Sequence, residues 1–292
     1  MEIGLNDNYR KIREGSAGFY EQKRGLIAVW GKEAVQFLDG LISNDMKTLE
    51  DGEMMLAAFP NAQGRLLAVV RVLRQGDRFL FDTEEATREK VFNNLFRFTF
   101  AGDFFVEDLS ESYSYFELFN MSEPRALVSG LSFGKNSTFV EKDNVPNFCE
   151  QLIAANSIDI SDDVHETLRI ESGIPKFGVD MDETTIVPEL GLDGLISYNK
   201  GCYIGQEIIA RIHFRGHVAK RLTGLALSVT VEPGTELFAA DGKNAGRVTS
   251  SIYSPKLERA IALAYVRYDY LSEGTELLAG TEAATVTSLP FI

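Results

Sequence analysis

The stretch that decides the expected fold is Lys200-Gly201-Cys202-Tyr203-Ile204-Gly205-Gln206-Glu207, in a chain of 292 residues. It holds one of the two cysteines and opens a segment, residues 200–221, with five basic residues against one acid. The whole chain has a net charge of −14, and residues 158–197 carry ten acids against two basic residues. Because a cleft lined by one sign of charge concentrates its field, this contrast predicts a positively charged pocket for a small anion.

Locally, the stretch predicts a tight turn that enters a helix. Gly201 and Gly205 allow close approach or a positive φ. From Tyr203 onward, apolar side chains recur on one helical face at Ile204, Ile208, Ile209 and Ile212. Cys202 would lie at the helix N-terminus, where the helix dipole and Lys200 favour the thiolate. We therefore expect a reactive cysteine, and the alternative is a small apolar residue packed at the helix start.

The octapeptide resembles the signature of the YgfZ family of folate-dependent iron–sulfur cluster assembly and repair proteins, which are related to the glycine cleavage T-protein (aminomethyltransferase). Further matches lie upstream in Leu168-Arg169-Ile170-Glu171-Ser172-Gly173-Ile174-Pro175, Phe177-Gly178-x-Asp180 and Pro188-Glu189-x-Gly191-Leu192. The resemblance is strong over residues 165–221 and loose elsewhere. It implies an α+β, T-protein-like fold with antiparallel sheets, helices and a small C-terminal β-barrel.

The resemblance also implies a site for tetrahydrofolate or a one-carbon derivative. By analogy with T-proteins, Glu171 would bind the pterin ring, since a carboxylate accepts two donors in one plane. Phe177 would stack on the pterin, and Arg211 and Arg215 would meet the glutamate tail. Lys200, Tyr203 and Asn61 complete the expected cofactor-binding set, and Cys202 is the expected catalytic residue. The alternatives are a solvated Glu171 paired with Arg169 or Lys176, a core Phe177 and surface ion pairs for the arginines.

The segment after Asn61 separates the two kinds of relative. T-proteins carry paired aspartates in this strand after two glycines, and one of them is essential for aminomethyl transfer. Here Arg65 replaces the second glycine, and the aspartate positions fall on Ala68 and Val69. Without a carboxylate, nothing there can orient the folate nitrogen or stabilise a developing positive charge. We expect a folate-binding protein that supports iron–sulfur clusters in client enzymes, with folate and client or assembly proteins as partners. The alternatives are a tetrahydrofolate-dependent aminomethyltransferase and a scaffold that binds no folate.

The composition narrows the class of protein to which the chain can belong. The chain is 45% hydrophobic and 25% charged, as in ordinary globular proteins. No apolar run approaches a membrane span, and the first residues lack the features of a secretory signal. Two cysteines predict a reducing, cytoplasmic setting, and the net charge argues against nucleic acid or anionic membrane as partner. His213 and His217 have metal-ligand spacing, but no second ligand follows at zinc-site spacing, so we expect no metal site.

The pattern of expected strands changes after Gly216, and together with the resemblance this implies three domains. Residues 1–115 and 116–216 would form two α+β parts of a folate-binding body, and residues 217–292 would form the barrel. In the first part the order β-α-β-β-β-α-β predicts an antiparallel sheet with helices on one face. Residues 1–24 are expected to be edge or loop structure, and Thr83 to cap a helix. Strands are also expected at 113–119, 126–128 and 138–140, helices at 146–155 and 164–172, and a long functional loop at 173–199.

Overall fold

The computed structural model describes residues 7–121 and 130–292, except for the side chain of Arg215. These residues form two compact units. Unit 1 comprises Met1–Ser161 and Gly194–Gln206, and unit 2 comprises Asp162–Asp193 and Glu207–Ile292. The predicted three-part division remains a prediction, since these units are cut differently and residues 194–206 return to unit 1. Within the described residues, no helix is long and apolar enough to cross a membrane.

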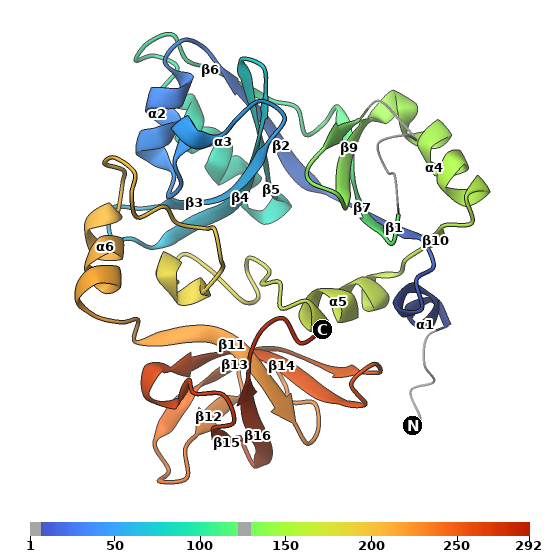
Figure 1. The fold of residues 1–292 in the computed structure, drawn as a ribbon, viewed down its shortest axis with the longest axis vertical. Helices are drawn as coiled ribbons and strands as arrows, with labels where there is room; N and C mark the ends of the chain where they lie inside the picture. Colours follow the sequence, from blue (N-terminus) through green and yellow to red (C-terminus); the bar gives the residue numbers. More distant parts are fainter. Residues whose placement is uncertain (1–6, 122–129) are drawn as a thin grey trace. The chain divides into compact units, whose positions relative to one another are not determined.

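The first sheet of unit 1 is antiparallel throughout and has the order β3-β4-β5-β2-β6. Its strands are β2 (Arg24–Trp30), β3 (Met54–Pro60), β4 (Leu66–Gln75), β5 (Arg78–Glu84) and β6 (Phe105–Asp108). Helices α2 (Ala34–Leu41) and α3 (Arg88–Phe96) bury their apolar sides in the same core, which confirms the β-α-β-β-β-α-β prediction (Figure 1). Thr83 does not cap α3, because it belongs to β5 and the turn Glu85–Thr87 comes before the helix.

The second sheet of unit 1 has the order β10-β1-β7-β9-β8. Its strands are β1 (Gly18–Gln22), β7 (Tyr113–Phe119), β8 (Leu131–Ser132), β9 (Ser137–Glu141) and β10 (Ile158–Asp159). Helix α4 (Val145–Ala154) packs on it through Phe148 and Leu152. The prediction of edge or loop structure for residues 1–24 is wrong for the described residues: α1 (Asp7–Arg13) buries Tyr9 and Ile12, and β1 lies between β7 and β10. The strand expected at 126–128 lies outside the described residues.

A buried group of charges joins the two sheets of unit 1. Asp82 on β5 is inaccessible to solvent and accepts hydrogen bonds from Arg24 Nε at 2.5 Å and Arg71 Nε at 2.5 Å. Arg71 also donates to Ser137 Oγ at 2.8 Å and Tyr115 Oη at 3.0 Å, both on the second sheet. Burial works to raise the pKa of Asp82, but the two guanidinium groups more than offset it and hold this pKa below its ordinary value.

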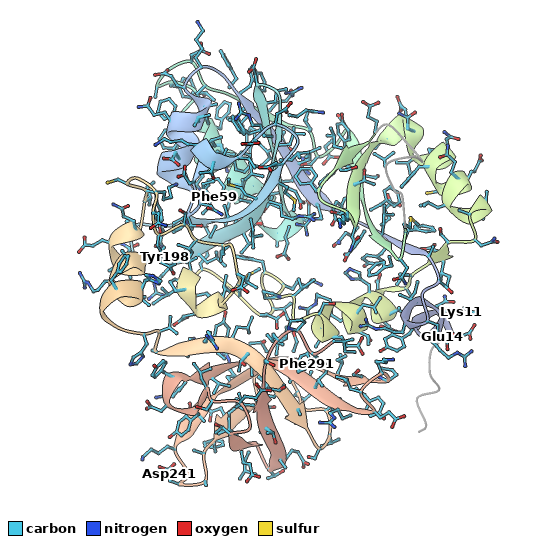
Figure 2. All side chains as sticks on the ribbon, viewed as in Figure 1. Lys11, Glu14, Phe59, Tyr198, Asp241 and Phe291 are labelled. Atoms are coloured by element: carbon cyan, nitrogen blue, oxygen red, sulfur yellow. The ribbon has the colours of Figure 1, made fainter. Side chains whose placement is uncertain are left out.

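Unit 2 is built around a closed barrel of six strands in the order β11-β14-β13-β12-β15-β16, as predicted. The strands are β11 (Lys220–Leu227), β12 (Glu236–Phe238), β13 (Asn244–Ser254), β14 (Arg259–Arg267), β15 (Glu276–Ala279) and β16 (Glu282–Thr287). Helix α5 (Asp162–Glu171) lies on its outer face, where Ile170 packs against Leu222 and Tyr265. Phe291, labelled in Figure 2, packs on the same face, and α6 (Gln206–Arg215) precedes β11.

The barrel contains a structural repeat that matches a repeat in the sequence. Gly234 and Gly274, both with positive φ, open the two copies of Gly-Thr-Glu-Leu. The Gly234 N–H donates to Val248 and the Gly274 N–H to Val286, each at 2.9 Å. The hairpins β12–β13 and β15–β16 are therefore closed in the same way, and Asp241 marks the turn of the first (Figure 2).

We predict that Asp82→Asn lowers the free energy of unfolding by about 3–5 kcal/mol, because it leaves two arginines beside an uncharged group. The matched control Glu107→Gln breaks an exposed pair with Arg78 and should cost less than about 1 kcal/mol. Since the folded-state pKa of Asp82 is depressed, its contribution is present above the unfolded-state pKa of about 4 and is lost as pH falls through the folded value. Urea denaturation of both variants between pH 7 and pH 3 measures this, and equal costs would contradict it.

Candidate functional site: the cysteine loop and the buried carboxylate of α5

Cys202 lies on a segment, residues 194–206, that is hydrogen-bonded at several points to the end of α2 and to the connection between α2 and β3 in unit 1. The Ser197 N–H donates to Ser43 O at 2.9 Å, and the Ile204 N–H to Gly40 O at 3.1 Å. The buried Ser43 Oγ donates to Leu195 O at 2.6 Å. We call residues 194–206 the cysteine loop; Tyr198, labelled in Figure 2, lies on it. Its partners come from more than 150 positions away in the sequence.

Lys200 is the central anchor of the cysteine loop. Its side chain is 1% exposed, and Nζ donates to Asp39 O at 2.6 Å, Ile42 O at 3.0 Å and Asn44 O at 2.6 Å. These carbonyls lie in the last turn of α2 and just after it, where backbone acceptors lack helical partners and a cation is favourable. The three ammonium donors are thus all engaged by the backbone. The structure therefore gives Lys200 a role in holding the loop.

Asp39 supplies the counter-charge for this lysine. Its carboxylate is 3.2 Å from Lys200 Nζ and also 3.2 Å from Nζ of Lys47, whose side chain is 65% exposed. Burial works to raise the pKa of Asp39, but the two ammonium groups more than offset it, and the pKa lies below its ordinary value. Burial conversely lowers the pKa of Lys200, although Asp39 opposes this.

The far end of the cysteine loop rests on the turn between β3 and β4. Gly205 has a φ of 81°, and a Cβ added there would lie 2.3 Å from the carbonyl oxygen of Asn61. The turn itself is closed by the Asn61 side chain, whose Oδ1 accepts from Gln63 N at 2.9 Å and Arg65 N at 3.0 Å. The two sequence motifs that separate this chain from T-proteins are thus in contact, and glycine is required at their closest approach.

Cys202 is exposed between these two anchors. It is not at a helix N-terminus, so that prediction is wrong: α6 begins at Gln206, because Gly205 is left-handed and Ile204 packs into the core of unit 1. Tyr203 is half-buried under the Lys200 ammonium, 5.1 Å from its ring centre, and burial raises its pKa to about 12. An exposed thiol on a fastened loop can act as a nucleophile or as a soft metal ligand.

Glu171, the predicted pterin ligand, is the last residue of α5 in unit 2. Its side chain is fully buried and Oε1 accepts a hydrogen bond from Ser254 Oγ at the end of β13. Its backbone oxygen accepts from Phe291 N at 2.9 Å, which ties the C-terminal residues to the helix. Glu171 is therefore not the solvated helix residue of the alternative interpretation.

The neighbouring motif residues hold the long loop 173–193 to the barrel. The buried Arg169 donates to Asp180 Oδ2 at 2.8 Å. Asp180 Oδ1 in turn accepts from Thr249 Oγ1 and Ser250 Oγ, both at 2.6 Å on β13. Arg169 of Leu-Arg-x-Glu and Asp180 of Phe-Gly-x-Asp thus share one buried network, which holds the loop within unit 2. Phe177 lies half-buried on it.

The remaining predicted residues lie on or after α6. Arg211 forms an exposed ion pair with Glu207 at 2.9 Å, the spacing expected from the sequence. These two residues, with Ala210 and Phe214, line a hollow of about 470 Å³. The side chain of Arg215 lies outside the described residues. His213 and His217 do not share a helical face, because His217 follows the helix and stacks on Tyr268.

Strand β4 has no carboxylate between Leu66 and Leu73. Ala68 is fully buried in the core of unit 1, and Val69 is half-buried on the opposite face. The position at which a transferase would present its aspartate therefore carries only aliphatic side chains.

Sequence reasoning missed the residues that hold the two motifs, chiefly Asp39, Ser43, Asn61 as a turn former, Asp180 and Ser254. Asn44-Asp45 after α2 gives a local signal, because such a pair predicts the end of a helix. It does not indicate which distant residues contact that helix end. Nothing in a single sequence pairs Lys200 with carbonyls some 160 positions earlier.

Comparison with known proteins agrees with this architecture. The N-terminal domain of the glycine cleavage T-protein family matches residues 1–128, and the "glycine cleavage T-protein C-terminal barrel domain" matches residues 220–292. The crystal structure of glycine cleavage system aminomethyltransferase T from Bartonella henselae superposes with a TM-score of 0.85 over 98% of this chain and 89% of that one, at 21% identity. That likeness shows a shared fold.

Two curated relatives show the two branches. An iron–sulfur cluster assembly factor IBA57 homolog, mitochondrial, from Mycosarcoma maydis is 31% identical over 229 residues, which is 72% of this chain and 57% of that protein. An aminomethyltransferase from Thermosipho melanesiensis is 24% identical over 302 residues, 92% of this chain and 82% of that protein. Fold and sequence thus define a protein of the glycine cleavage T-protein class. Within that class, the chain belongs to the YgfZ-type family that its octapeptide indicated.

We predict that Lys200→Met destabilises the chain by about 3 kcal/mol, since it leaves Asp39 and three carbonyls without their buried partner. It should also make Cys202 react faster with a neutral thiol reagent, because the loop loses its anchor. Urea denaturation and alkylation by iodoacetamide measure the two effects. Arg211→Met, which removes an exposed cation, serves as the control and should change stability by less than about 1 kcal/mol. Equal effects of the two substitutions would contradict the anchoring role.

Proposed function

We propose that this protein binds tetrahydrofolate or a one-carbon derivative and supports the assembly or repair of iron–sulfur clusters in client proteins, with Cys202 as the reacting thiol. The observation that carries the proposal is the exposed Cys202 between two fixed points, the Lys200 anchor and the Gly205 contact. A thiol on a fixed loop is preorganised for transfer to or from a partner. The name of the Mycosarcoma maydis relative, an iron–sulfur cluster assembly factor, supports the proposed role.

The aliphatic strand β4 argues against the alternative, an aminomethyltransferase. Transfer of an aminomethyl group develops positive charge on the carbon that moves, and a carboxylate would be needed beside it. Ala68 and Val69 offer none. The aminomethyltransferases among the relatives therefore support the assigned fold and the proposed binding of folate. We do not extend their aminomethyl transfer to this protein.

For the folate, we propose Glu171 as the acceptor for the pterin ring. The proposal is supported by the Leu-Arg-x-Glu match to T-proteins and by the chemistry of the side chain, since a carboxylate accepts two donors in one plane. Phe177, Tyr203, Arg211 and Arg215 remain proposed contacts. The polar groups of Lys200 and Asn61 hold the cysteine loop and the turn that supports it. We therefore propose that these two residues contribute to the site by keeping the loop and the turn in place.

We expect tetrahydrofolate to bind saturably in a calorimetric titration, and Glu171→Gln to weaken binding by roughly tenfold, because an amide offers one acceptor oxygen where the carboxylate offers two. The control Glu232→Gln changes the net charge equally on an exposed barrel turn and should bind as the wild type does. No binding by the wild-type protein would overturn the folate proposal and favour the scaffold alternative.

We expect Cys202→Ser to abolish support of iron–sulfur enzymes in cells that depend on this protein, because a hydroxyl is neither a thiolate nucleophile nor a soft metal ligand. Activity of an iron–sulfur enzyme in cell extracts measures this. Cys149→Ser, at the half-buried second cysteine, should retain full support. If Cys202→Ser supports these enzymes as well as the wild type does, the thiol has no part in the function.

A further inference from the structure

We infer that Lys47 makes Cys202 selective for anionic reaction partners. This inference rests on the proposed function, because it concerns the same thiol. Lys47 lies outside every sequence motif described above, on the short turn Met46–Thr48 that follows α2 in unit 1.

The geometry places the Lys47 ammonium beside the residue that precedes the cysteine. Asp39 Oδ2 is 3.2 Å from Lys47 Nζ, and the same oxygen is 4.0 Å from where a Cβ on Gly201 would lie. Since adjacent Cα atoms are about 3.8 Å apart, the ammonium lies on the order of 10 Å from the backbone of Cys202. The turn that carries Lys47 is itself fixed, because Asp45 Oδ1 accepts its backbone N–H at 3.0 Å.

The two lysines on Asp39 have different roles. Lys200 is 1% exposed and fully engaged by carbonyls, whereas the Lys47 side chain is 65% exposed and reaches only the carboxylate. Lys47 can therefore turn toward a molecule approaching from solvent without disturbing the loop. The charged groups at Asp39, beside Gly201, are the cations Lys47 and Lys200 and the anions Asp39 and Asp45.

These two cations and two anions cancel locally, in a chain whose net charge is −14. At about 10 Å in water, one unit charge changes the concentration of a singly charged reactant by about twofold, and more where solvent is partly excluded. Without Lys47 the local charges would sum to −1, and they would repel anions together with the negative charge of the rest of the chain. Iron–sulfur clusters held by thiolates are a class of partner with added negative charge, which fits the proposed role.

The test compares alkylation of Cys202 by iodoacetate, an anion, with alkylation by neutral iodoacetamide. Both reagents react with the thiolate, so the ratio of their rates cancels any change in the fraction of thiolate. Wild type, Lys47→Gln and Lys47→Arg are compared in the Cys149→Ser background, so that only Cys202 reacts. Lys142→Gln changes the net charge equally in the connection after β9 and is the matched control.

We expect Lys47→Gln to lower the iodoacetate-to-iodoacetamide ratio by about twofold at 10 mM salt, and Lys47→Arg to retain it. The difference should vanish at 1 M salt, where the screening length is about 3 Å. An unchanged ratio in Lys47→Gln, or an equal fall in Lys142→Gln, would overturn the inference. This readout needs neither folate nor a client enzyme, so it can fail while the proposed function stands, and the reverse is also true.

Discussion

The buried ammonium of Lys200 is the contact on which the arrangement of the site depends. One positive charge satisfies three carbonyls at the end of α2 and neutralises Asp39, and it does so from a segment about 160 residues further along the chain. Burying such a charge is unfavourable unless every donor is paired, and here every donor is. The cysteine loop therefore belongs to unit 1 although the residues on either side of it in sequence belong to unit 2. Cys202 is held in place without taking part in any of these contacts.

In unit 2, too, a buried and paired charge holds the motif residues in place. Arg169 and Asp180 are buried together, and hydroxyl groups on β13 complete the hydrogen bonds of the carboxylate. In both units, charged side chains that could bind a ligand instead hold loops in place. The groups that stay exposed beside the cysteine loop are the thiol of Cys202 and the ammonium of Lys47, whose side chain is 65% exposed. Residues 66–73 of β4 carry no carboxylate. The contacts that hold the loops of the two units do not involve this part of β4, so the fold does not require a carboxylate there.

Much of the fold could be predicted because it follows local patterns. Apolar runs and helical periodicity predicted the order of strands and helices around the first sheet, and the C-terminal barrel was also expected. The start of α6 was misplaced because apolar periodicity continues through Ile204, whereas tertiary packing draws Ile204 into unit 1 and leaves Gly205 left-handed. The N-terminal helix was missed because its buried residues, Tyr9 and Ile12, are too few to produce a pattern. The roles of Lys200 and Asp180 depend on partners that are distant in sequence, which no local pattern contains.

The position of Cys202 depends most on the cysteine loop being a fixed part of unit 1. Hydrogen–deuterium exchange at the amides of Ser197 and Ile204 tests it directly, because these donate to Ser43 and Gly40. If the loop is fixed, both amides are protected by roughly a thousandfold or more over an open peptide, and Lys200→Met removes most of that protection. Exchange of both amides in the wild type at the rate of an open peptide would mean that the loop is loose, and would contradict the account.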